Sequence, residues 1–120
     1  MAKLTEDAKK LISEVRVALV ATASRSGKPN VSPKGLRVLD DEHVAFADIA
    51  SPRTMSNLAE NPQLALIVFD AAKRKGCRLW GKAEVLASGA EFEAVKADFS
   101  RMNMKVKNVV KVALDQVETF

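Results

Sequence analysis

The sequence is poor in the residues that build disulfides, metal centres and hydrolytic triads. Its 120 residues include one cysteine, one histidine, one tryptophan and no tyrosine. The single cysteine, Cys77, cannot form an internal disulfide, and this usage predicts a protein of the reducing cytoplasm. The single histidine, His43, follows three acidic residues at 40–42. We interpret this cluster as a turn, because no second histidine is present to complete a zinc or haem site and nothing supports a Ser-His-Asp triad.

Long hydrophobic runs are also absent. No apolar run approaches the ~18 residues of a membrane-spanning helix, and the charged residues of 1–10 lack the apolar core of a signal peptide. The net charge of +4 favours anionic partners. Basic residues at 73–75, Lys105, Lys107 and Lys111 leave a nucleic-acid-binding barrel as an alternative, but aromatic residues for base stacking are scarce. We therefore expect neither a membrane nor a nucleic acid as partner.

The hydrophobic pattern predicts a single domain, residues 1–120, with six short strands and three helices. The strands are expected at 17–24, 30–39, 44–48, 63–70, 77–86 and 108–117. The helices are expected after Thr5, over 52–60 and after Ser88, where Ser88 and Glu91 have the spacing of a capping box. Short strands at this spacing predict mostly β structure: a six-stranded antiparallel barrel, closed or partly closed, with flanking helices.

Two strands carry signs of irregularity. Pro33 and Gly35 interrupt the second strand and predict an edge, a bulge or a close approach by something other than a side chain. Gly81 predicts a bulge or bend in the fifth strand. Most strands are apolar on both faces, which indicates burial beyond one barrel wall. A homodimer would supply it, and helices covering both faces are the alternative.

The segment 44–62 reads as a buried strand, a tight turn and a helix whose first turn is positively charged. Ser51 is a favoured N-cap residue and Pro52 suits the first helical position. Arg53 and Thr54 then lie in the first turn, where an arginine opposes the helix dipole unless an anion binds over it. We interpret this turn as a phosphate site; the alternative for Arg53 is an exposed surface side chain.

Several short segments resemble the pyridoxamine 5′-phosphate oxidase-like family of FMN-binding split barrels. They are 30–35 (NVSPKG), 38–40 (VLD), 46–48 (FAD), 51–54 (SPRT), 57–62 (NLAENP) and 81–84 (GKAE). The resemblance implies a split barrel that holds FMN at the interface of a homodimer.

The resemblance also implies which residues bind the cofactor. Phosphate contacts would come from the segment 32–37 and from Arg53 and Thr54, and the strand end at Ala47 and Asp48 would lie along the flavin. Ser51 would add a hydroxyl, and Lys34 would reach either the ring edge or the phosphate. The candidate cofactor-binding residues are Ser32, Pro33, Lys34, Gly35, Arg37, Ala47, Asp48, Ser51, Arg53 and Thr54.

The sequence departs from the oxidase itself. The oxidase usually has a lysine where Thr54 stands and an arginine where Ser32 stands, and its extended C-terminal segment has no counterpart here. We therefore expect a small FMN-dependent oxidoreductase or electron-transfer protein that uses a small-molecule donor or acceptor, with no catalytic residue identified. A non-enzymatic flavin carrier or sensor is the alternative, and relatives of this fold also use deazaflavin or haem. Arg78 and Trp80 share one face of the fifth expected strand. We expect them to contact the cofactor, a partner chain or simply the core.

Overall fold

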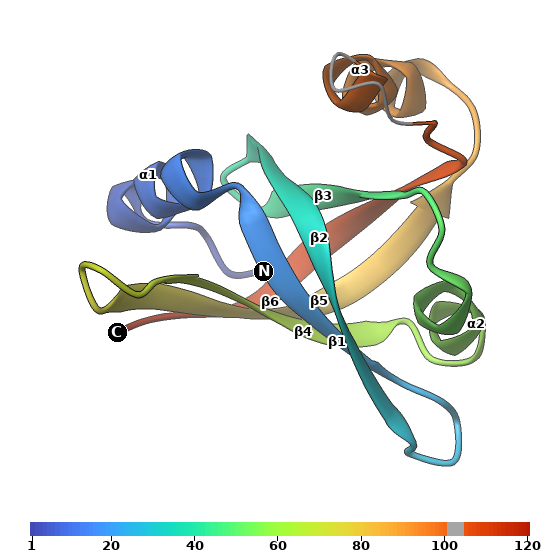
Figure 1. Ribbon diagram of the computed structural model, residues 1–120, viewed down its shortest axis with the longest axis horizontal. Helices are drawn as coiled ribbons and strands as arrows, with labels where there is room; N and C mark the ends of the chain where they lie inside the picture. Colours follow the sequence, from blue (N-terminus) through green and yellow to red (C-terminus); the bar gives the residue numbers. More distant parts are fainter. Residues whose placement is uncertain (101–104) are drawn as a thin grey trace.

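Six antiparallel strands form a closed barrel in the order β1-β2-β3-β6-β5-β4 (Figure 1). This computed structural model describes residues 1–100 and 105–120. The strands are β1 (Val17–Ala23), β2 (Pro29–Asp40), β3 (His43–Asp48), β4 (Gln63–Asp70), β5 (Lys75–Leu86) and β6 (Asn108–Thr119), and the helices are α1 (Glu6–Val15), α2 (Pro52–Glu60) and α3 (Ala90–Ser100). The predicted fold class is confirmed, and the predicted strands match with ends that differ by two residues or fewer.

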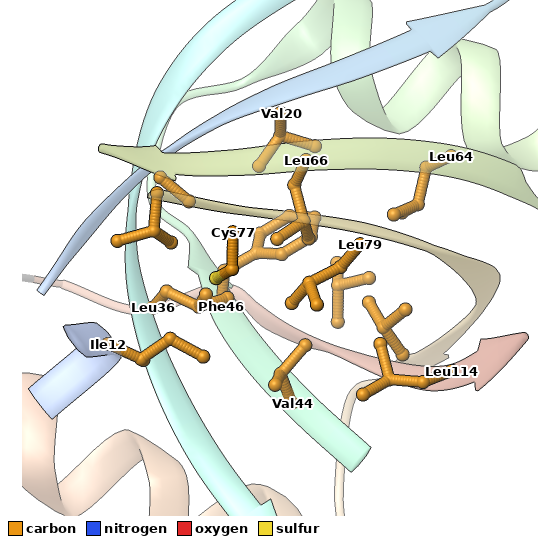
Figure 2. Close-up of a cluster of buried hydrophobic side chains, with 14 of the residues drawn as sticks. Ile12, Val20, Leu36, Val44, Phe46, Leu64, Leu66, Cys77, Leu79 and Leu114 are labelled. Atoms are coloured by element: carbon orange, nitrogen blue, oxygen red, sulfur yellow. The ribbon is translucent and has the colours of Figure 1, made fainter. Parts of the chain in front are cut away.

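The barrel interior is filled by alternate residues of the strands, because successive side chains of a strand point to opposite faces. Figure 2 shows Val44, Phe46, Leu79 and Leu114 among the side chains of this buried cluster. Cys77 lies in the same cluster and is fully buried, and burial raises the pKa of its thiol. Cys77 is therefore a small hydrophobic residue of a strand that faces the core.

The second strand changes partner halfway along its length. Residues 29–35 of β2 pair with β1, whereas Leu36 and the residues after it pair with β3. Pro33 therefore lies in the part of β2 that is hydrogen-bonded to β1 alone. The other side of β2 is a strand edge there, as predicted. The irregularity of β2 lies between Val38 and Asp40, not at Pro33 and Gly35.

Two glycines lie where another residue would not fit. A Cβ on Gly35 would lie 2.7 Å from the ring of Phe99, so the close neighbour is a side chain, contrary to the expectation. The bulge predicted near Gly81 is confirmed by a register shift between Trp80 and Gly81. A Cβ there would collide with the backbone carbonyl of Ala113.

Two helices cover parts of the barrel with apolar residues. In α1, Ala8 and Ile12 are buried against the barrel, and the Thr5 hydroxyl accepts the Ala8 N–H at 3.1 Å as predicted. In α3, Phe92 and Val95 pack on the outer face of β3 and β6. None of the helices in the described residues is long and apolar enough to cross a membrane.

The third helix begins later than its sequence predicts. α3 starts at Ala90, and the Gly89 carbonyl accepts the Glu93 N–H, so Gly89 and not Ser88 precedes the helix. The predicted Ser88 cap is therefore wrong. The sequence also predicts an apolar stripe of Phe92, Val95, Phe99 and Met102 on this helix, of which Met102 lies outside the described residues.

α3 covers the outer face of β2 at Gly35 and Arg37, but in the described residues the outer face of β1 and of the first residues of β2 stays exposed. Val17 and Leu19 are each 50% exposed and Val31 is 63% exposed. The alternative in which helices cover both faces of the sheet is therefore wrong for this part of the barrel.

Candidate functional site

Four polar side chains meet where β2 faces the start of α2. Ser32 and Lys34 point from β2 toward the barrel side of the strand, because they alternate with residues of its outer face. The Ser32 Oγ lies 3.0 Å from Thr54 Oγ1, and the Lys34 ammonium donates to the Ser51 hydroxyl. We refer to Ser32, Lys34, Ser51 and Thr54 as the polar cluster.

Charge in this cluster is only partly compensated. Burial lowers the pKa of Lys34, while attraction to the Asp48 carboxylate acts in the opposite direction. Since the burial effect dominates, a further negative charge beside this amine would favour its protonated form. Lys34 is thus suited to face an anion.

The start of α2 has no side-chain cap. Ser51 occupies the N-cap position and Pro52 the first helical position, both as predicted, but the Ser51 hydroxyl makes no cap bond. The hydroxyl is occupied by Lys34 instead. No acceptor is found among the described residues for the N–H groups of Arg53 and Thr54, and no acidic residue lies in the first turn.

The two residues of that first turn differ in exposure. Thr54 is 1% exposed, and its hydroxyl reaches Ser32 across the gap between helix and strand. Arg53 is exposed and has no ion-pair partner within the described ranges 1–100 and 105–120. A free guanidinium beside open N–H groups is a donor set that suits a phosphate.

Asp48 has a structural role in this region. Its carboxylate is buried and accepts the Ser51 backbone N–H at 3.2 Å and the Asn108 side-chain amide at 2.9 Å. It therefore ties the turn before α2 to β6. Sequence reasoning missed Asn108, which lies 60 residues further along the chain and is recognisable only once the pairing of β3 with β6 is known.

A second buried contact anchors α2 to the barrel. The Asn57 side-chain amide donates to Thr22 Oγ1 at 3.1 Å, and Thr22 is 3% exposed. Sequence reasoning missed this contact as well. The Asn57 amide is not connected to the polar cluster by any hydrogen bond in the described residues.

Other candidate residues lie apart from the polar cluster. Arg37 is on the opposite face of β2 from Ser32 and Lys34 and forms an ion pair with Asp98 of α3. Ala47 packs under α3. Pro33 and Gly35 share the strand face of Arg37. Pro33, Gly35, Arg37 and Ala47 therefore do not face the polar cluster.

Arg78 and Trp80 lie on the outer face of the barrel. The Arg78 guanidinium is 5.9 Å from the Trp80 ring centroid and 5.3 Å from that of Phe120, and it pairs with Glu118. A shallow groove of about 390 Å³ runs beside Trp80 over Ala21 and Ala65. Neither side chain belongs to the polar cluster of the same chain.

A larger concavity lies away from the polar cluster. It measures about 510 Å³ and lies between α1 and the basic turn at 73–75. Neither concavity includes a member of the polar cluster.

The turn expected at the acidic cluster is present at 41–42, but His43 is already the first residue of β3 and pairs with Asp40. The His43 Nδ1 lies 2.8 Å from Asp40 Oδ1, and bonds from the Glu42 N–H and His43 lower the pKa of Asp40. Within residues 1–100 and 105–120, no group of three or more potential metal ligands is found.

Comparison with known proteins gives consistent results. The sequence profile described as pyridoxamine 5′-phosphate oxidase matches residues 4–120. An uncharacterised protein of Methanocaldococcus jannaschii is 41% identical over 121 residues, which span 96% of this chain and 79% of the relative. The structure of HupZ from Group A Streptococcus superposes with a TM-score of 0.86 at 30% identity, covering 97% of this chain and 98% of HupZ.

More distant structures share the fold alone. An FMN-binding protein of Syntrophomonas wolfei has a TM-score of 0.85 at 19% identity, with 95% of this chain and 84% of that chain covered. HutZ of Vibrio cholerae, described as a heme storage protein, has a TM-score of 0.76 at 19% identity, with 98% of this chain and 94% of HutZ covered. Proteins with this fold are thus described with different cofactors.

Proposed function

We propose that this chain, which belongs to the pyridoxamine 5′-phosphate oxidase family, is a dimeric flavoprotein that binds FMN with the phosphate over the start of α2. The observation that carries the proposal is the open, positively charged end of this helix. Arg53 adds a cation where the helix dipole is already positive, and the first-turn N–H groups have no acceptor in the described residues. A bound dianion would compensate both features.

The residues at this end fit a phosphate ester. The N–H groups of Arg53 and Thr54 and the Arg53 guanidinium can donate to phosphate oxygens, and the hydroxyls of Ser32 and Thr54 can rotate to donate as well. Lys34 adds a second positive charge. When FMN is bound, its isoalloxazine ring would supply the redox chemistry, while these residues hold the anionic end.

A second copy of the chain is the proposed partner. The outer face of β1 is apolar and half exposed at Val17 and Leu19, and it continues through the register onto Ile67 of β4 and Val31 of β2. Ser32 and Lys34 of the polar cluster lie on the same strand β2, on its other face, so a copy docked on β1 and β2 would lie close to the site. Burial of the face would also account for strands that are apolar on both sides.

The proposed activity is electron or hydride transfer with a small-molecule donor or acceptor. Flavin chemistry of this kind need not use a protein general acid or base. A flavin carrier or sensor without turnover remains the second candidate. The single buried thiol of Cys77 supports a place in the reducing cytoplasm.

The test is an absorbance spectrum of the freshly purified protein, followed by titration of flavin-free protein with FMN and with riboflavin. We expect a flavin spectrum, quenching of FMN fluorescence at one FMN per chain, and at least about tenfold weaker binding of riboflavin, since riboflavin lacks the phosphate. Size-exclusion chromatography with light scattering should give twice the mass of one chain.

Other outcomes would redirect the proposal. A haem or deazaflavin spectrum with no affinity for FMN would refute FMN as the cofactor. Equal affinities for FMN and riboflavin would remove the phosphate from the start of α2. FMN binding without turnover of NADH, NADPH, quinones or nitro compounds would favour the carrier or sensor.

A further inference from the structure

A chain of hydrogen bonds connects β6 to the start of α2. The Asn108 side-chain amide donates to Asp48 Oδ2 at 2.9 Å, and the other carboxylate oxygen accepts the Ser51 backbone N–H at 3.2 Å. The Ser51 hydroxyl in turn accepts the Lys34 ammonium. Each oxygen of Asp48 thus has one donor, and the carboxylate joins the last strand to the turn before the helix.

The orientation of the Asp48 carboxylate depends on Asn108. Asp48 is only 4% exposed, so water has little access to an oxygen that loses its donor, and a buried carboxylate without donors is unfavourable. Without the Asn108 amide, only the Ser51 N–H would still donate to the carboxylate, which would then be free to rotate, so the geometry of the Ser51 bond would no longer be fixed. The backbone pairing of Asp48 with Asn108 would remain, because it does not involve this side chain.

We propose that Asn108 is a positioning residue, whose amide holds Asp48 in the orientation that fixes Ser51 and so aims the start of α2 at the anion. Asn108 does not contact the anion itself. The inference rests on the proposed function for its effect on FMN, but its effect on the turn exists without any ligand. The two effects are therefore measured separately.

The experiment compares Asn108→Ala with the matched control Asn57→Ala. Both variants remove one side-chain amide whose donor bond ends on a buried oxygen, but only Asn108 belongs to the chain that leads to Ser51. The first readout is amide hydrogen exchange of Ser51 in the ligand-free protein, measured by NMR. The second readout is the ratio of the dissociation constants for FMN and riboflavin.

We expect the Ser51 amide of Asn108→Ala to exchange at least about tenfold faster than in the parent protein, because its acceptor is no longer held. FMN should bind about five- to tenfold more weakly while riboflavin binding changes less than about twofold, since only the anionic end loses its alignment. Asn57→Ala should change neither the Ser51 exchange rate nor the ratio.

The outcomes separate the two proposals. If the parent protein does not bind FMN, the proposed function fails, and the Ser51 exchange rate alone then decides the role of Asn108. Unchanged Ser51 exchange in Asn108→Ala, or exchange equally fast in Asn57→Ala, would overturn the inference. Should Asn108→Ala not fold, Asn108→Asp is measured in the same way; it keeps the side-chain volume but replaces the donor with a second carboxylate, and slow Ser51 exchange there would overturn the inference too.

Discussion

The two helices α1 and α2 both cover the barrel, yet their first turns are built in opposite ways. The Thr5 hydroxyl caps α1, and two acidic residues, Glu6 and Asp7, lie in its first turn, where they complement the helix dipole. In α2, Ser51 makes no cap bond and the first turn carries Arg53 with no acidic residue. The two helices lie on different sides of the barrel in Figure 1.

The difference separates a helix end that carries its own stabilising groups from one that lacks them. Every feature that stabilises the start of α1 by itself is missing or reversed at α2. Local stability has been lost at α2 in the region where Ser32, Lys34 and Thr54 also gather. Because functional sites are where local rules of stability are most often broken, the contrast points to α2 as the end that binds.

The largest expected effect concerns the charge at this end. Arg53→Ala should weaken FMN binding at least tenfold, which agrees with losing about 1.5–3 kcal/mol of charge-assisted hydrogen bonding. The free energy of unfolding of the ligand-free protein should change by less than about 0.5 kcal/mol, because Arg53 is exposed. Fluorescence titration and urea denaturation measure the two quantities.

Arg37→Ala is the control for that prediction. The resemblance to the family places Arg37 at the phosphate, but the structure pairs it with Asp98 on the other face of β2. Its replacement should leave FMN affinity within about twofold of the parent value, since it would contribute no phosphate contact. A larger loss with Arg37→Ala than with Arg53→Ala would place the anion on the outer face of β2, away from α2.

A smaller effect is expected from the two residues that precede the helices. Thr5→Ala should lower the free energy of unfolding by about 1 kcal/mol, because it removes a cap bond. Ser51→Ala should lower it by less than about half of that, because it removes no cap bond and only the partly exposed hydrogen bond from Lys34. Equal losses in urea denaturation of the ligand-free proteins would mean that the two helix ends do not differ.

How far the sequence predicts these features depends on how local their causes are. The Thr5 cap, Pro52 at the first position of α2 and the bulge at Gly81 each follow from residues that are neighbours in the chain, and all three were predicted. Ser51 precedes α2 as predicted, but its hydroxyl makes no cap bond and instead accepts the ammonium of Lys34, 17 residues away. The register that brings Lys34 there is set by the whole barrel and not by the turn.

The candidate site shows the same limit. Asn108 and Asn57 could not be predicted, because their partners are 60 and 35 residues away and depend on how β3 pairs with β6 and how α2 lies on β1. The position of Arg37 could have been predicted. Strand alternation alone puts Arg37 on the opposite face of β2 from Ser32 and Lys34.

The smallest expected effect is a difference in pH dependence between the two helix ends. Beside α1, hydrogen bonds to Asp41 and Glu6 raise the pKa of Lys9 above its ordinary value of 10.5. Beside α2, burial lowers the pKa of Lys34 below that value. Between the lowered pKa and 10.5 the unfolded chain binds more protons at Lys34, so this lysine makes stability rise with pH in that window. Above 10.5 the folded chain retains its proton at Lys9 longer, so stability falls as pH rises through the raised pKa.

Lys34→Gln and Lys9→Gln separate the two contributions. Relative to the parent protein, Lys34→Gln should lose the rise in unfolding free energy just below pH 10.5, and Lys9→Gln should lose the fall just above it. Urea denaturation at closely spaced alkaline pH values measures both slopes. Slopes of the same sign for the two lysines would contradict the contrast between the helix ends. Partial burial should make the folded chain lose the Lys34 proton more easily, whereas the bonds to Asp41 and Glu6 should make it keep the Lys9 proton longer.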